Sequence, residues 1–140
     1  TLGGIDGIQL DNNDDVELMS NIKSELGAIY DVDKLEDWKC GLRIFSVGSS
    51  IPWHEDGEHG LVTTTYLNQG AWDRDWGGAL LYQKKHGEIG AQFPEYNKMI
   101  VLSGRYNEQN HMWHAVAPIQ QLPDEIVLRI SLQTFAQLYE

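Results

Sequence analysis

The stretch Val-Leu-Arg-Ile-Ser-Leu-Gln-Thr-Phe, residues 127–135, alternates apolar and polar side chains and therefore predicts a β-strand. Successive side chains of a strand point to opposite faces, so Arg129, Ser131 and Gln133 are expected to share one face. An arginine within an otherwise apolar strand needs an anionic partner, because an unpaired buried charge is costly. The segment thus indicates a strand that carries both packing and binding residues.

The same period of two, or a short apolar run, recurs upstream at residues 42–47, 61–67, 79–82, 98–102 and 112–116. Weaker candidates lie at residues 52–54 and 89–93, and turns containing Gly, Pro, Asn and Asp separate the segments. About eight short strands indicate a mainly β protein, either a β-sandwich or a jelly roll. The long connections at residues 68–77, 103–110 and 119–125 are candidate functional loops.

One helix is expected at about residues 13–30, before the strands. Apolar residues recur there every three or four positions, and Asn13 or Asp14 is placed to cap the first turn. An acidic connection at residues 31–37 leads from this helix to Trp38. The 140 residues are expected to form one domain, residues 1–140, with this supporting helix and a β-core at about 41–136.

Composition excludes several classes of protein. The net charge of −11, without a basic cluster, would repel a phosphate backbone, so no nucleic-acid partner is expected. No apolar run approaches the roughly 18 residues that span a bilayer, so no membrane partner is expected either. A single cysteine, Cys40, cannot form an internal disulfide, which fits a reducing, cytoplasmic location.

Three residues suggest a metal site. In extended backbone, His54 and Asp56 project to the same face, and His114 comes from a strand late in the chain. Two histidines and one carboxylate form the facial triad that binds Fe(II) in oxygenases and leaves three coordination positions open. The His-x-Asp pair alone is a weak signal, because chance supplies such pairs often in a chain of this composition.

Arg129 strengthens this interpretation. A bound dicarboxylate would neutralise its guanidinium, with the hydroxyls of Tyr66 and Ser131 as further donors. The alternative partner is a structural Asp or Glu.

Five motifs together carry a resemblance. They are Thr65-Tyr66-Leu67-Asn68, Trp76 to Tyr82, Pro94 to Ser103, His114-Ala115-Val116-Ala117-Pro118 and Arg129 to Phe135. In order and spacing they resemble the prolyl 4-hydroxylase branch of the 2-oxoglutarate/Fe(II) oxygenases, which includes the hypoxia-sensing prolyl hydroxylases. The resemblance covers about residues 42–135 and implies a double-stranded β-helix, a distorted jelly roll with the metal at its open end.

The resemblance also implies roles. By position, His54, Asp56 and His114 correspond to the iron ligands, and Arg129 and Tyr66 to the residues that hold the far carboxylate of 2-oxoglutarate. Ser131 is a further candidate for this carboxylate, since only some relatives use that position. The implied cofactors are Fe(II), 2-oxoglutarate and O₂, with ascorbate as an additional candidate.

The implied reaction is hydroxylation coupled to decarboxylation of 2-oxoglutarate. The resemblance favours a prolyl residue of a peptide or protein as substrate, and a free amino acid or other small molecule is the main alternative. Three departures from the family pattern put the substrate in question: Phe45 replaces a usual Tyr, Ala79 follows Gly78 where an acidic residue is common, and residues 120–125 lengthen the gap between His114 and Arg129.

Other readings of these residues remain open. A jelly-roll lectin or cupin-like module without turnover would use the same fold, and a zinc site would need His111 and His114 on one helix. The remaining single-residue expectations are His59 and His86 as solvated turn residues, Trp53 and Trp113 as core, Trp72 and Trp76 as core or as a lid over the substrate, and Arg105 as a surface or substrate-contacting residue.

Overall fold

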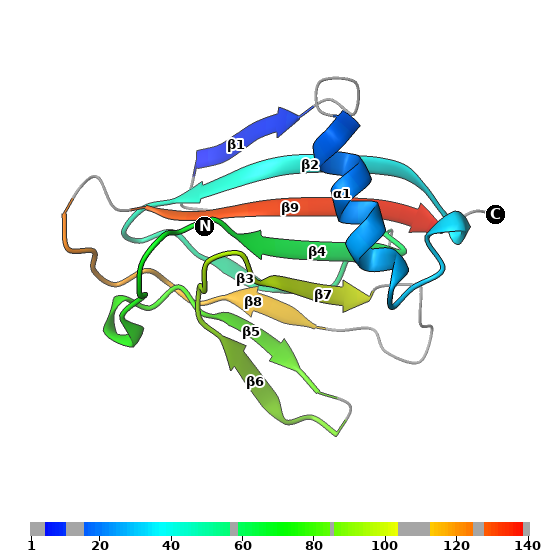
Figure 1. Ribbon diagram of the computed structural model, residues 1–140. Coiled ribbons are helices and arrows are strands. Elements are labelled where there is room, and N and C mark those ends of the chain that lie inside the picture. The colour runs from blue at the N-terminus through cyan, green and yellow to red at the C-terminus, as the bar shows by residue number, and fades with distance from the viewer. Residues whose placement is uncertain are drawn as a thin grey trace.

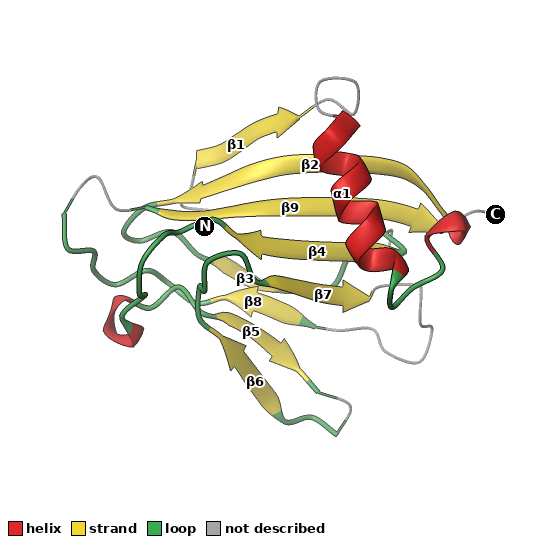
Figure 2. Ribbon diagram, viewed as in Figure 1, coloured by secondary structure: helices red, strands yellow, loops and turns green. Residues whose placement is uncertain are grey.

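Two antiparallel sheets form the body of the protein (Figures 1 and 2). The computed structural model describes residues 5–10, 16–56, 59–84, 86–103, 113–124 and 128–138. The elements of these residues are β1 (Ile5–Leu10), α1 (Val16–Gly27), the 3-10 turn η1 (Val32–Lys34), β2 (Leu35–Phe45), β3 (Ile51–His54), β4 (Leu61–Tyr66), the 3-10 turn η2 (Arg74–Trp76), β5 (Leu80–Gln83), β6 (Ile89–Gln92), β7 (Met99–Ser103), β8 (His114–Val116) and β9 (Arg129–Leu138).

The larger sheet has the strand order β1-β2-β9-β4-β7, and the smaller sheet has the order β3-β8-β5-β6. β9 lies at the centre of the larger sheet, where Arg129 pairs with Phe45 of β2 and Ser131 pairs with Tyr66 of β4. Many neighbouring strands in these sheets are distant in sequence, as in a jelly roll. Residues of both sheets line one cavity, so the two sheets face each other. The predicted mainly β jelly roll with one supporting helix is therefore confirmed.

An apolar core fills the space between the two sheets. Its buried members are Phe45, Val62, Leu80, Leu102, Val116 and Ile119. Five of its members come from β2, β4 and β7 of the larger sheet and from β5 and β8 of the smaller sheet, and Ile119 follows β8. The polar face of β9 also points to this interior: Gln133 lines the cavity between the sheets, and Arg129 and Ser131 are buried.

α1 covers the outer face of the larger sheet (Figure 1). Met19, Ile22 and Leu26 follow the helical spacing and pack in one cluster with sheet residues that include Leu35, Trp38, Leu132 and Ala136. Burial of each large apolar side chain contributes about 1.5–3 kcal/mol, so packing on the sheet stabilises this helix. Among the described residues, no helix is long and apolar enough to span a membrane.

The boundaries differ from prediction at three places. The helix ends at Gly27 instead of residue 30, and Ile29, which was expected on its apolar face, is 72% exposed. The predicted cap at Asn13 or Asp14 lies outside the described residues. The strands extend beyond 41–136, because β1 precedes the helix and β9 continues to Leu138.

The third difference is that β2 begins inside the acidic stretch, at Leu35. The register of β2 with β9 shifts between Glu36 and Lys39, and Asp37 adopts a positive φ of 53°. Such a bulge interrupts the alternation of side chains and conceals the strand in the sequence. Leu35 and Trp38 are nevertheless buried under α1.

Candidate metal centre and co-substrate pocket

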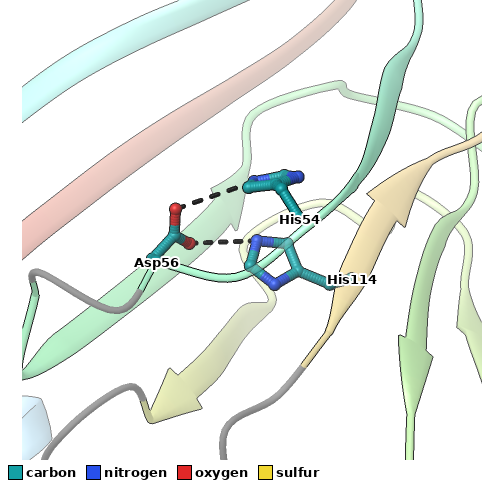
Figure 3. A group of neighbouring side chains, drawn as sticks. All are labelled: His54, Asp56 and His114. Atoms are coloured by element: carbon teal, nitrogen blue, oxygen red, sulfur yellow. Dashed lines mark ion pairs between the residues drawn. The ribbon is translucent and has the colours of Figure 1, made fainter.

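β3 and β8 of the smaller sheet bring two histidines together. His54 ends β3, His114 begins β8, and the two are direct partners across the antiparallel pair. Asp56 follows β3 by two residues, and its carboxylate faces both imidazoles (Figure 3). Nε2 of His114 lies 3.0 Å from Oδ2 of Asp56, and Nε2 of His54 lies 3.6 Å from Oδ1. The structure therefore joins all three predicted ligands in one group.

The group has the geometry of a metal site. One ligand atom from each residue lies within 4.8 Å of the others. Nδ1 of His54 donates to the carbonyl oxygen of Pro52 at 2.8 Å. Nε2, on the side of Asp56, therefore carries the lone pair that can bind a metal. A hydrogen bond of this kind orients a metal-binding imidazole and sets its tautomer.

Electrostatics favour an ionised carboxylate here. Burial by itself disfavours the charged form of Asp56, but a hydrogen bond from His114 and the charges of His114, His54 and His59 outweigh that effect, so the pKa of Asp56 is lowered. Two neutral imidazoles and one carboxylate are the donor set of the Fe(II) facial triad. The described part of the chain adds no fourth Cys, Asp, Glu or His to this group. The residues present therefore fit a metal with open coordination positions.

A cavity of about 380 Å³ opens beside the triad, between the sheets. Its walls combine the apolar core with polar side chains. The lining residues are Arg43, Phe45, Ser50, Ile51, His54, Asp56, His59, Val62, Thr64, Leu80, Leu102, His114, Val116, Gln133 and Phe135. A space of this size accommodates a small dicarboxylate together with part of a second substrate.

Arg129 is a buried cation next to this cavity. Its residue is 1% exposed, and its Nε donates to the carbonyl oxygen of Gly78 at 2.8 Å. The Cζ atom lies 5.4 Å from the ring centroid of Phe45 and 5.3 Å from that of Tyr66. No described residue partners its Nη2 atom or the hydroxyl of Tyr66. Two buried donors without acceptors therefore lie side by side.

Burial lowers the pKa of Arg129 and raises the pKa of Tyr66, because the charged form of each is disfavoured away from water. Ser131, the third predicted contact, is also fully buried, and its hydroxyl accepts a hydrogen bond from Gln133 at 3.4 Å. Phe45 lines the cavity, whereas Arg129, Tyr66 and Ser131 do not. The ring of Phe45 thus touches both the cavity and the guanidinium.

Two residues of the cavity wall were not predicted as functional. His59 was expected to be solvated, but it lines the cavity and its ring stacks on Phe135. A histidine in a turn carries no sequence signal of such a contact. Arg43 and Phe45 are two positions apart on β2 and so lie on the same face of the strand. This spacing could have revealed that Arg43 points inward. His86 is exposed in a turn, as expected.

The tryptophans correct two further expectations. Trp53 and Trp113 are 42% and 44% exposed instead of core, because each precedes a triad histidine and so points to the opposite face of the smaller sheet. Trp72 and Trp76 contact each other edge to face at 5.0 Å. Neither lines the cavity, so they are not placed as a lid over it.

Trp72 instead packs near Arg129. A Cβ atom on Gly78 would lie 3.4 Å from Trp72 and 3.2 Å from Cδ of Arg129. The indole Nε1 donates to the carbonyl of Gly77 at 2.9 Å. Arg105 and His111 lie outside the described residues. The alternative zinc site at His111 and His114 therefore stays a prediction.

No protein-family model matches the sequence, and no curated protein matches it either. Solved structures do match. A prolyl 4-hydroxylase from Pseudomonas putida aligns over 95% of this chain and 71% of its own, with 18% identity and a TM-score of 0.72. A prolyl hydroxylase from Trichoplax adhaerens, in complex with a hypoxia inducible factor peptide fragment, aligns over 97% of this chain and 60% of its own, with 16% identity and a TM-score of 0.66.

The viral collagen prolyl hydroxylase of Paramecium Bursaria Chlorella virus-1, solved as a 2-oxoglutarate complex, aligns over 96% of this chain and 81% of its own, with 10% identity and a TM-score of 0.65. These likenesses cover most of this chain. The chain therefore has the double-stranded β-helix fold of these 2-oxoglutarate/Fe(II) oxygenase structures.

Proposed function

We propose that this protein is a 2-oxoglutarate- and O₂-dependent hydroxylase that acts on prolyl residues of a peptide or protein. One observation carries the proposal: a His-Asp-His group meets beside a cavity whose neighbouring cation, Arg129, has no anionic partner among the described residues. A sugar-binding module would need neither feature. The fold shared with prolyl hydroxylases supports the same class of reaction.

In this proposal, Nε2 of His54, Nε2 of His114 and the carboxylate of Asp56 hold Fe(II). When bound, the iron activates O₂ so that oxidative decarboxylation of 2-oxoglutarate to succinate and CO₂ is coupled to hydroxylation of the substrate. The pKa of Asp56 is lowered despite its burial, which is consistent with an ionised carboxylate as the third ligand. The three residues would hold the metal by three ligand atoms, and the other coordination positions would remain for ligands.

Arg129 and Tyr66 would bind the far carboxylate of 2-oxoglutarate. Their unpartnered donor atoms provide charge-assisted hydrogen bonds, and the carboxylate neutralises the guanidinium that burial otherwise disfavours. Phe45 lines the cavity and lies against the guanidinium of Arg129. A ligand in the cavity would therefore have to displace the ring of Phe45 to reach the guanidinium. Ser131 lies between these groups on β9 and would contribute a weaker contact.

The apolar walls of the cavity would keep water from the reacting groups. Val62, Leu80, Leu102 and Val116 line it on both sheets. Exclusion of water strengthens the electrostatic contacts of the bound dicarboxylate and limits turnover without substrate.

The substrate class rests on the relatives. One is a prolyl 4-hydroxylase, one a collagen prolyl hydroxylase and one a prolyl hydroxylase bound to a peptide. A second candidate substrate is a small molecule that carries a carboxylate, such as a free amino acid, because Arg43 adds a cationic group to the cavity wall.

Two measurements test the proposal. Under anaerobic conditions, Fe(II) and 2-oxoglutarate together are expected to give a visible metal-to-ligand charge-transfer band that Asp56→Asn and metal chelation abolish. In air, with ascorbate, a panel of proline-containing peptides and free L-proline is scanned by mass spectrometry for the gain of one oxygen atom that depends on 2-oxoglutarate. A peptide product supports prolyl hydroxylation, a product from proline alone favours the small-molecule candidate, and absence of the band contradicts the enzyme class.

A further inference from the structure

His59 is a cavity residue that the proposed reaction does not yet use. It follows Asp56 by three residues, and its backbone N–H donates to the carbonyl oxygen of Asp56 at 2.9 Å. Its ring lies 4.9 Å from the ring of Phe135, at an interplanar angle of 46°. These two contacts fix the imidazole in the wall of the cavity, next to the triad.

The ring carries an unused hydrogen-bonding atom. Nδ1 of His59 is buried, and no described residue lies at hydrogen-bond distance from it. The same holds for Thr63, Tyr66 and Arg129, but Thr63 does not line the cavity, and the other two are assigned to the co-substrate. A buried polar atom without a partner is uncommon in native proteins and indicates a missing ligand.

The co-substrate does not supply this partner. His59 stacks on Phe135, which lies six residues along β9 from Arg129, a separation of about 20 Å between the Cα atoms. A five-carbon diacid held at its far carboxylate by Arg129 is much shorter than this separation, so it cannot also reach His59. The unpartnered Nδ1 of His59 is therefore left for the second substrate.

We infer that His59 is a substrate-binding residue whose Nδ1–H donates to a carbonyl or carboxylate oxygen adjacent to the carbon that is hydroxylated. This inference rests on the proposed hydroxylase function. A peptide would offer a backbone carbonyl, and a free amino acid would offer its carboxylate. Because the imidazole packs against the ring of Phe135, this contact would orient the substrate toward the metal group.

Three variants separate the hydrogen bond from the ring. His59→Asn places an amide near the position of Nδ1, His59→Gln extends the amide toward the position of Nε2, and His59→Phe keeps only the stack on Phe135. His86→Asn is the matched control, because His86 is exposed in the turn between β5 and β6. Each protein is assayed with the peptide that gives the largest oxygen gain in the screen above and with free L-proline.

We expect His59→Phe and His59→Gln to raise the substrate KM about three- to tenfold, as loss of one hydrogen bond predicts. His59→Asn is expected to stay within about twofold of the parent. The KM for 2-oxoglutarate and the anaerobic charge-transfer band should not change. The ratio of succinate formed to product formed should rise in the Phe and Gln variants, because a badly oriented substrate uncouples the two half-reactions.

The outcomes are distinct. An effect on the peptide alone identifies a backbone carbonyl as the partner, and an effect on free proline alone identifies its carboxylate. Equal substrate KM values in all variants overturn the inference, as does a loss of the charge-transfer band in the Phe and Gln variants, which would show a role in holding Asp56. If the parent protein lacks the band or hydroxylates neither probe, the proposed function itself is wrong, and the inference falls with it.

Discussion

At the scale of single residues, a buried guanidinium without an anion is costly, and Arg129 has no anionic partner among the described residues. Its Nε has the Gly78 carbonyl as partner, but Nη2 has none among the described residues. Replacement of an uncompensated buried charge by a neutral side chain does not in general destabilise a protein. Arg129 is therefore better explained by binding than by stability.

Arg129→Gln should separate these two roles. We expect the thermal midpoint without 2-oxoglutarate to stay equal to that of the parent or to rise, because the unpaired charge is gone. The KM for 2-oxoglutarate should rise by at least about tenfold, the value of one charged hydrogen bond. Added 2-oxoglutarate should raise the midpoint of the parent but not of the variant. Arg74→Gln, at an exposed arginine, is the control, and a large loss of stability in Arg129→Gln alone would contradict this explanation.

The backbone of Gly78 lies close to the side chain of Arg129. A Cβ atom there would lie 3.2 Å from both Arg129 and Ile119, and the residue has a φ of +73°. Gly70 has a similar φ of +86°, but a Cβ atom there would meet nothing within 4 Å. The pair therefore separates backbone strain, which both positions share, from crowding of the arginine, which occurs only at Gly78.

Gly78→Ala and Gly70→Ala test this separation. Both should lower stability by about 1–2 kcal/mol through the left-handed backbone conformation. Gly78→Ala alone should also raise the KM for 2-oxoglutarate, because the side chain of Arg129 has to shift. Urea unfolding and steady-state kinetics provide the two readouts. Equal effects of both variants on this KM would show that the approach of Gly78 to Arg129 has no functional consequence.

At the scale of elements, the regular strands could be predicted, and the irregular features could not. β4, β5, β7 and β9 alternate or form short apolar runs, so their side chains reveal their faces. The bulge of β2 at Asp37 breaks this alternation, and its acidic residues resemble a connection. The sequence therefore indicated most of the strands, but it placed the start of β2 seven residues too late, at residue 42 instead of Leu35, and it missed β1.

The candidate site shows the same division. The period of two predicted the shared inward face of β9, which carries Arg129. The His-x-Asp spacing alone was a weak signal, and the link of His54 and Asp56 to His114 rested on the family resemblance. The contact of His59 with Phe135 joins a turn to a strand 76 positions away, since 135 − 59 = 76, and no local pattern records it. Trp53 and Trp113 were misassigned because large aromatic residues usually pack in a core, whereas here the face of the smaller sheet is open.

α1 stabilises the larger sheet from the side opposite to the cavity. Leu26 is 1% exposed and packs with Leu35 and Trp38 of β2. Leu26→Ala is expected to cost about 2–5 kcal/mol of unfolding free energy through the lost contacts and the remaining cavity. The KM for 2-oxoglutarate should stay unchanged, because the cavity lies on the other face of the sheet. Ile29→Ala, at an exposed position just after the helix, is the control in urea unfolding, and a raised KM in Leu26→Ala would show that the two faces are coupled.

At the scale of the whole molecule, the strongest global property is a net charge of −11. A field of this sign attracts cationic partners over distances comparable to the Debye length, about 10 Å at 0.1 M salt and about 3 Å at 1 M. Arg43 lines the cavity and Arg129 lies buried against Phe45 of the cavity wall, so contacts with these arginines act over shorter distances than this field. The charge should therefore govern how fast a peptide approaches, whereas the cavity governs how its target residue is held.

This division predicts a salt-dependent preference among peptide substrates. Two peptides with the same prolyl centre, one flanked by lysines and one by glutamates, should differ in kcat/KM at low ionic strength, with the lysine peptide favoured by about tenfold or more. The ratio should fall toward one as salt approaches about 1 M, because screening removes the long-range field but not the contacts in the cavity. Their kcat values should agree at every salt concentration. Steady-state assays across a salt series measure both quantities, and a preference that persists at high salt would mean that a charged contact in the bound complex, rather than the field of the whole protein, selects the substrate.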